Sequence, residues 1–454
     1  MSDCKLPRVI TGGSLLLIAA LSVTVVVLLI VWVRMPAFLA LAAGSLIVGL
    51  AARMPLPDIP RAFQAGVGDT LGFVAMVIGL GTVMGKLLAE SGGAGVVSAA
   101  VIRAMGVRRL DWAMMLSGFV IGLPVFFQVG LVLLAPVMFT VAQTTGTPLL
   151  RLGLPLVAGL STAHGLVPPH PGPVAALALL YADAGRTLLY SLIVGLPTAI
   201  ISGPLFARFA TARVSSEPGT MAAQLAGRTT TDRPPSLAIT LLTILMPVLL
   251  MLAAALAQAL LPQSPARAAL EFAGTPLMAM LLATLLALVT FGTACGFDRT
   301  RILQFAEEAL PPIASVLLVV GAGGGFARVL DLAGVDTAIA QAMSGTALSP
   351  LVLGWLIASL LRISVGSATV SVVTAAGIMA PIVTAMPGVN RELLVVAIGA
   401  GSLIAGHVND GGFWLVKEYL NTTVPQTLAT WTVLETIVAV CGLLGALALG
   451  VVIG

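Results

Sequence analysis

Apolar runs long enough to cross a lipid bilayer, or nearly so, follow one another along most of this chain. They lie at about 13–33, 36–52, 66–89, 112–145, 148–163, 187–207, 237–261, 275–292, 312–331, 350–386, 391–406 and 428–453. A transmembrane helix needs about 20 mainly apolar residues, and inside lipid only helices and closed barrels satisfy their own backbone polar groups. Charged residues make up 9% of the 454 residues, against about 25% in a soluble domain. The sequence therefore predicts an all-α polytopic membrane protein.

Two of these runs are too long for a single pass. The runs at 112–145 and 350–386 have room for two passes or for a re-entrant hairpin. Pro124 and Gly366 supply the breaks, because proline lacks an amide hydrogen and glycine reaches backbone angles closed to other residues. Counting hairpins, we expect about ten to fourteen membrane segments.

A polar stretch from Thr211 to Ser236 divides the chain into two parts of similar length. We interpret residues 1–210 as a first membrane half, 211–236 as a linker loop and 237–454 as a second membrane half.

The two halves carry a weak internal repeat. Residues 79–92 align with 321–334 without a gap, at a lag of 242 residues. Three arginines at 103, 108 and 109 follow the first copy, whereas the loop at 344–350 after the second copy has no charge. Because basic loops face the cytoplasm, we predict inverted-topology repeats, an architecture typical of secondary transporters.

Two polar islands interrupt the apolar pattern and together hold all three histidines. The first, STAHGLVPPHPGP, runs from Ser161 to Pro173, and the second, GHVNDGGFW, runs from Gly406 to Trp414. The four prolines of the first island cannot all lie in one continuous helix. Unwound backbone at membrane depth is tolerated only where it is buried in protein or lines a watery cavity. We predict two broken helices facing one shared substrate and ion site. The alternatives are an extramembrane loop for the first island and an interfacial turn for the second.

The second island offers three side chains suited to such a site. Asp410 can take a proton or hold a cation, and an ionisable residue within a membrane segment is a functional candidate by default. Asn409 offers two donors and an acceptor, and the ordinary titration range of His407 lies near neutrality.

A buried cation is predicted in the segment RISVGSATV. Arg362 lies there in a long apolar run, without an acidic neighbour in the sequence. Because a guanidinium grips a carboxylate through two parallel bonds, an arginine beside hydroxyl groups predicts a hydroxy-carboxylate substrate. The alternative is that Arg362 snorkels to the membrane interface. The hydroxyl groups around Gly366 come from Ser364, Ser367, Thr369 and Ser371.

Other polar residues receive weaker interpretations. Lys86 and Arg328 occupy equivalent positions of the repeat and are interpreted as interface anchors or as site residues. Glu90, Asp331 and Glu435 are interpreted as surface or packing groups.

The three motifs HGLVPPHPGP, RISVGSATV and HVNDGGFW, in this order and at these spacings, resemble the gluconate permease (GntP-type) family of bacterial proton symporters. The likeness runs from Met35 to Glu435. It implies uptake of a sugar acid driven by a proton gradient, a fold with scaffold and transport domains, and a homodimer in the bacterial plasma (inner) membrane. The hairpin tips would lie near 128–130 and 364–369, and the broken helices at 162–173 and 407–412.

Two positions depart from the family pattern. The position of Gln128 often carries a carboxylate in the family, and a glutamine cannot titrate. The usual Asp-Pro-Gly of the second island is Asp-Gly-Gly here. Proton coupling is therefore expected at Asp410, His407 and His164. Substrate contacts are expected at Gln128, Gly130, Thr162, His164, His170, Gly172, Arg362, Ser364, Gly366, Ser367, Thr369 and Asn409.

The expected function is secondary transport of gluconate or a related aldonate by proton symport with alternating access. The alternatives are a carrier of another small hydroxy acid or of D-serine, a transporter coupled to another cation, and a passive channel. HExxH spacing, a defined Ser–His pair and a GxxxxGK[ST] loop are absent, so neither an enzyme nor ATP-driven transport is favoured. No metal, cofactor or nucleic-acid partner is expected, because the cysteines are scattered singly and no basic stripe occurs.

Overall fold

The computed structural model describes residues 12–214, 216, 233–335, 349–386, 388–407 and 410–453. In this part of the chain the regular structure is entirely helical, which confirms the predicted fold class. The first half contains α1 (Gly12–Val31), α2 (Ala37–Ala51), α3 (Asp58–Glu90), α4 (Gly93–Met105), α5 (Leu110–Gly122), α6 (Phe127–Thr145), α7 (Leu149–Leu166), α8 (Pro171–Leu180), α9 (Ala184–Ile200) and α10 (Phe206–Thr211). The second half contains α12 (Leu237–Leu260), α13 (Pro265–Ala273), α14 (Pro276–Ala287), α15 (Arg299–Ala309), α16 (Ala314–Leu332), α18 (Pro350–Val365), α19 (Ala368–Ala385), α20 (Arg391–Gly401), α21 (Gly411–Tyr419), α22 (Val424–Thr427) and α23 (Val433–Ile453).

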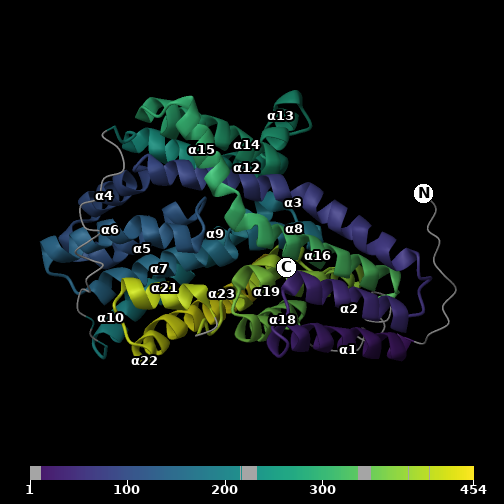
Figure 1. Ribbon diagram of the computed structural model, residues 1–454. Coiled ribbons are helices and arrows are strands. Elements are labelled where there is room, and N and C mark those ends of the chain that lie inside the picture. The colour runs from purple at the N-terminus through teal and green to yellow at the C-terminus, as the bar shows by residue number, and fades with distance from the viewer. Residues whose placement is uncertain are drawn as a thin grey trace.

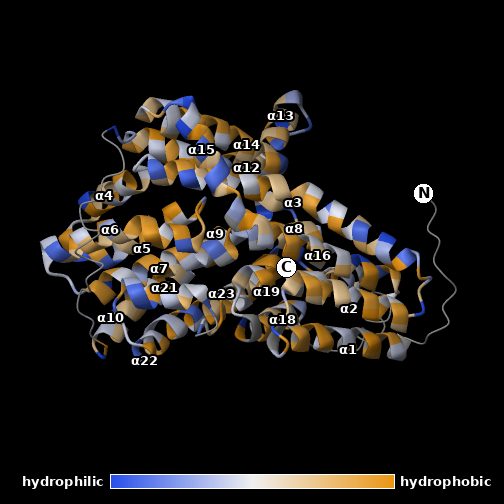
Figure 2. Cartoon of the chain, in the orientation of Figure 1, coloured by the Kyte–Doolittle hydropathy of each residue, from blue (hydrophilic) through white to orange (hydrophobic). Residues whose placement is uncertain are grey.

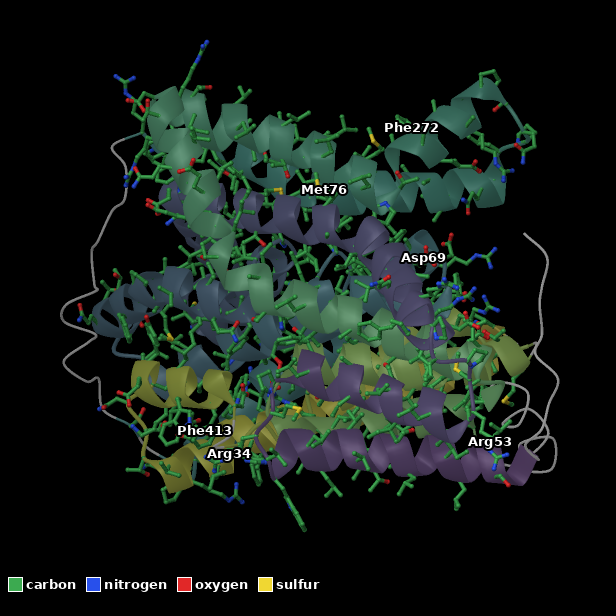
Figure 3. All side chains as sticks on the ribbon, turned by 45° about the vertical axis from the view of Figure 1, so that its right-hand side comes forward. Arg34, Arg53, Asp69, Met76, Phe272 and Phe413 are labelled. Carbon is green, nitrogen blue, oxygen red and sulfur yellow. The ribbon has the colours of Figure 1, made fainter. Side chains whose placement is uncertain are left out.

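The helices have the length and composition of membrane spans. Among the described residues, 8 helical segments are long and apolar enough to cross a bilayer, and four shorter apolar helices accompany them. Together these segments fall within the predicted range. Hydrophobic residues are spread over most of the helices in Figure 2, among neutral and hydrophilic ones, and large apolar side chains such as Met76 and Phe272 lie exposed at 57% and 62% (Figure 3). Exposed apolar surface on this scale fits lipid contact.

Both long runs fold into helical hairpins at the predicted breaks. The chain turns between α5 and α6 around Pro124, and between α18 and α19 at Gly366. Gly366 has φ +77°, and its amide donates to the Arg362 carbonyl at 2.9 Å. That left-handed conformation is easy for glycine and costly for residues with a Cβ.

Both islands break their helices, although at slightly different places than predicted. α7 continues through Thr162 and ends at Leu166, and α8 begins at Pro171, where the missing amide hydrogen costs nothing. The second break is longer, because α20 ends at Gly401 and α21 begins only at Gly411. Residues 408 and 409 lie outside the described part of the chain.

The helices of the two halves are intermingled (Figure 1). α3 packs along α16, which holds the second copy of the repeat, and α8 packs on α19. Within the halves, α5 packs on α7 and α18 on α20, so each hairpin lies against a broken helix. α12 and α14 pack together beside α3. The assignment of two inverted halves and a linker stays a prediction, since most of 211–236 lies outside the described residues.

Close backbone contact between α5 and α7 depends on glycine. A Cβ on Gly159 would lie 2.3 Å from the Met115 carbonyl oxygen and 2.6 Å from the Phe119 amide nitrogen. Gly159→Ala is therefore expected to destabilise the fold by about 1–3 kcal/mol, because backbone atoms cannot move aside. The readout is the melting temperature of the protein in detergent. The control is Gly68→Ala on α3, whose Cβ meets nothing within 4 Å. Equal melting temperatures for the two variants would contradict this packing.

Candidate functional site

A cavity of about 180 Å³ lies where the hairpins and broken helices meet. Seven residues expected from the sequence line it, namely Gln128, His164, Arg362, Gly366, Ser367, Thr369 and Asp410. They come from α6, α7, α18, the tip between α18 and α19, α19 itself and the N-terminal end of α21. The volume suits a small solute, since drug-sized ligands need about 300–1,000 Å³.

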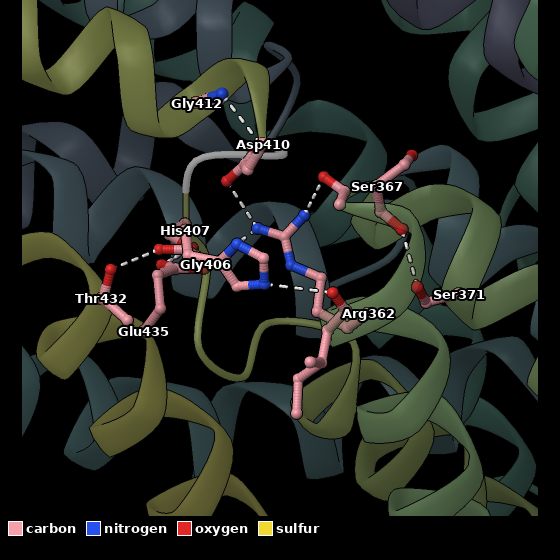
Figure 4. A network of polar contacts seen from close by, with 12 residues as sticks. Arg362, Ser367, Ser371, Gly406, His407, Asp410, Gly412, Thr432 and Glu435 are labelled. Atoms are coloured by element: carbon pink, nitrogen blue, oxygen red, sulfur yellow. Dashed lines mark hydrogen bonds and ion pairs between the residues drawn. The ribbon is translucent and has the colours of Figure 1, made fainter. Parts of the chain in front are cut away.

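Arg362 is the buried centre of the cavity wall. Its residue exposure is 3%, so it does not snorkel to an interface. Nη2 donates to Asp410 Oδ2 at 2.6 Å, and Nη1 donates to the Gly366 carbonyl (Figure 4). Arg362 has no acidic neighbour in the sequence, but the fold brings Asp410 of the second island into contact with it. A buried charge of this kind requires a partner.

Asp410 ties the second island to the hairpin. It is the N-cap of α21, and its Oδ1 accepts the Gly412 amide at 2.8 Å while Oδ2 faces Arg362. A carboxylate at a helix N-terminus is favoured by the unpaired amides there. Both oxygens of Asp410 are therefore engaged by fixed donors.

A second buried carboxylate, Glu435 of α23, also lines the cavity. It is 1% exposed, its Oε1 accepts from Ser161 Oγ at 2.5 Å, and its Oε2 lies 4.0 Å from Arg362 Nη2. Glu435 is therefore buried and not a surface group, and its place on the cavity wall was not expected from the sequence. An ionisable residue inside a long apolar segment was the available signal, the same criterion that selected Asp410.

Three buried donor or acceptor atoms facing this region have no hydrogen-bond partner among the described residues. They are Arg362 Nε, His164 Nδ1 and Trp431 Nε1, and all three side chains line the cavity. A buried polar atom left unpaired costs about 1–3 kcal/mol, so such groups in a native fold call for an explanation. A polar solute in the cavity supplies one. Trp431 was not expected from the sequence, where it lies inside the apolar run at 428–453.

Other predicted site residues lie elsewhere. A ring nitrogen of His170 contacts the Gly122 carbonyl, and this ring lies 5.0 Å from that of His164. Gly130 packs near Leu160, and Gly172 near Val372. Thr162 is buried, with its methyl group near Gly195 on α9. None of these four lines the 180 Å³ cavity.

The third histidine is displaced from the cavity as well. His407 Nε2 lies 3.1 Å from the Ile363 carbonyl, where it links the second break to α18. Among the histidines of the two islands, His164 alone lines the cavity. Asn409 and the side chain of Ser364 lie outside what the structure describes, and their roles stay predictions.

A wider cavity of about 1210 Å³ adjoins the small one and shares Gln128, His164, Ser367 and Thr369 with it. Lys86 on its wall pairs with Glu90 at 2.8 Å and with Glu308 at 3.0 Å. The hydrogen bond from the Lys86 ammonium lowers the pKa of Glu308, which lies on the exposed α15. Arg328 instead pairs with Asp331 at 2.9 Å away from either cavity.

The arrangement is suited to holding a small carboxylate beside several hydroxyl groups. The family model for GntP family permeases matches residues 14–452. The chain belongs to the GntP permease family. It is 46% identical to a gluconate permease from Pseudomonas aeruginosa over 441 residues, covering 97% of this chain and 98% of that one. It is 43% identical to the high-affinity gluconate transporter of Escherichia coli, covering 96% of this chain and all of the other.

The fold is shared with a distant transporter. MtrF of Neisseria gonorrhoeae, described among antimetabolite efflux pumps, superposes with a TM-score of 0.59 at 14% identity, covering 86% of this chain and 84% of the other. This GntP family member is therefore a multi-pass membrane protein with the architecture of known membrane transporters.

Proposed function

We propose that this GntP family permease is a secondary transporter that imports gluconate or a related aldonate across the bacterial inner membrane together with a proton. The observation that carries the proposal is the buried Arg362 on the wall of a small cavity, with unpaired polar atoms beside it. The names of the relatives support the substrate class. Location in the inner membrane, homodimer formation and the roles of individual residues belong to the proposal.

In this proposal the substrate carboxylate competes with Asp410 for the Arg362 guanidinium. The guanidinium has five N–H groups, and Nε has no partner among the described residues. A carboxylate entering the cavity can therefore make a two-pronged contact through Nε and Nη2 if Asp410 yields. Binding then exchanges one ion pair for another instead of leaving a charge unpaired.

The remaining polar groups of the lining are proposed to read the sugar hydroxyls. Gln128 and Thr369 offer donors and acceptors, and Ser367 adds a hydroxyl. Trp431 and His164 each offer a ring nitrogen that has no partner among the described residues. A site built to hydrogen-bond hydroxyl groups rejects analogues that lack them, because its own polar groups are then left unpaired.

Alternating access is proposed to move the hairpins and broken helices as the site opens to either side. The cavity is formed by elements from both sides of the polar linker, with α6 and α7 from residues 1–210 and α18, α21 and α23 from residues 237–454. Relative movement of two such groups of helices changes which side of the membrane reaches a site between them.

The test is uptake of radiolabelled gluconate by cells lacking their own permeases. We expect accumulation that an uncoupler abolishes, and competition by aldonates that carry both the carboxylate and the hydroxyl groups. Glucose is the matched control, since it keeps the hydroxyls and lacks the carboxylate. Stronger competition by D-serine than by aldonates would support the amino-acid alternative, and uptake that only equilibrates would favour a channel.

A further inference from the structure

Among the described residues that line the small cavity, Glu435 is the carboxylate with an oxygen that accepts no hydrogen bond. We infer that Glu435 carries the coupling proton on Oε2 and that the proton and the substrate carboxylate occupy the cavity together. The inference rests on the proposed function and names the group that would couple it. It replaces the expectation that Asp410 or a histidine does so.

One carboxylate oxygen of Glu435 accepts a hydrogen bond, and the other accepts none from the described residues. Oε1 accepts from Ser161 Oγ at 2.5 Å. The contact of Oε2 among the described residues is with Arg362 Nη2 at 4.0 Å, which is beyond hydrogen-bond distance. A proton on Oε2 therefore breaks no existing hydrogen bond, and the neutral carboxyl gains a donor that can point into the cavity.

Asp410 has no such oxygen, because both of its carboxylate oxygens accept hydrogen bonds. Its Oδ1 accepts the Gly412 amide and its Oδ2 accepts from Arg362. Protonating either oxygen would displace a donor, which would weaken the cap of α21 or the contact with Arg362. Gln128, which also lines the cavity, has an amide side chain that does not titrate.

The charges around Glu435 link the proton to the substrate. The charged or titratable groups that line the cavity are Arg362 of α18, Asp410 at the start of α21, His164 of α7 and Glu435 itself. No charged side chain of α9 or α20, which also pack on α23, is among the described residues of the lining.

The sum of these charges opposes an anion while Glu435 is ionised. With His164 neutral, the described residues of the lining then supply one cation and two carboxylates. A substrate carboxylate would bring a third negative charge into a buried site, where repulsion is poorly screened. A proton on Glu435 removes one of those charges. Protonation then favours substrate binding, and by thermodynamic reciprocity the substrate favours protonation.

This coupling gives a symport cycle without a carboxylate at position 128. A proton arriving from the outer side neutralises Glu435, the sugar acid binds at Arg362, and the loaded cavity opens inward. When the substrate leaves, its negative charge no longer favours the protonated form of Glu435, and Glu435 releases its proton. Proton and anion thus cross together because each is held poorly without the other.

The experiment uses purified protein in proteoliposomes and compares Glu435→Gln with wild type. Two assays are run on each: gluconate accumulation driven by a pH gradient, and exchange of labelled for unlabelled gluconate with no gradient. The glutamine keeps the size and an acceptor for Ser161 but cannot release a proton. We expect gradient-driven accumulation to fall by at least about tenfold while exchange persists. Glu418→Gln is the control, because Glu418 is 58% exposed and pairs with Lys417.

The outcomes separate the two claims. Accumulation by Glu435→Gln equal to wild type overturns the inference and leaves gluconate transport standing. Absence of gluconate exchange in wild type overturns the proposed function and the inference with it.

A second variant keeps the test decisive if Glu435→Gln fails to fold. Ser161→Ala removes the hydroxyl that donates to Oε1 of the ionised carboxylate, so the midpoint of uptake against pH is expected to move upward by about one unit. A purely structural contact would lower the amount of protein without moving the midpoint, and an unmoved midpoint overturns the inference.

Discussion

Replacing Arg362 by alanine is expected to lower gluconate uptake by at least about 30-fold, because truncating one partner of a buried charge pair costs about 2–5 kcal/mol. No other cationic side chain among the described residues lines the small cavity to meet the substrate carboxylate. Asp410 and Glu435 are left as two buried carboxylates without the guanidinium that faces both. The measurement is the initial rate of radiolabelled gluconate uptake per amount of protein in the membrane.

The alanine variant also threatens the fold, since an uncompensated buried charge is strongly destabilising. Arg362→Lys is the companion variant, because lysine keeps the charge but loses the planar fork. We expect it to reach the membrane in normal amounts with KM raised by about tenfold or more. Arg328→Ala is the control, since Arg328 is exposed and pairs with Asp331 outside the cavities. Uptake by Arg362→Ala within twofold of wild type would show that Arg362 does not bind the substrate carboxylate.

Local chemistry of the chain was enough to predict the breaks in the helices. Pro124, Gly366 and the prolines after Val167 each forbid or disfavour continuation of a helix, and the structure breaks at those places. The same reasoning placed the second break too late, because Ser402 to Ala405 contain no proline to mark the end of the helix. Ala405 has φ +47°, which its side chain gives no reason to expect.

The cavity lining was predictable only where a residue is unusual in its own segment. Arg362 and Asp410 stand out as charges in apolar surroundings, and the structure pairs them at 2.6 Å. Glu435 stands out by the same rule, but its contact with Ser161 joins residues 274 positions apart. Such a contact depends on how α23 packs against α7, which periodicity along either helix does not determine. The histidines misled for the same reason, since His170 and His407 bind backbone carbonyls next to the cavity instead of lining it.

Asp410→Asn is expected to tighten substrate binding and slow transport, with KM and the maximal rate each falling by about tenfold. The asparagine can still accept the Gly412 amide and cap α21. It no longer competes as an anion for Arg362, so the substrate carboxylate meets a freer guanidinium. The same change removes the group that reclaims Arg362 when the substrate leaves, and release becomes slow.

The control for this prediction is Asp298→Asn, because Asp298 caps α15 through the Arg301 amide at 2.7 Å as Asp410 caps α21. Loss of cap strength alone would therefore affect both variants alike, whereas opposite movement of affinity and rate is specific to the position beside Arg362. A rise in KM for Asp410→Asn would show that Asp410 helps to hold the substrate. The proposal that the substrate carboxylate replaces Asp410 at Arg362 would then be wrong, even if gluconate remains the substrate.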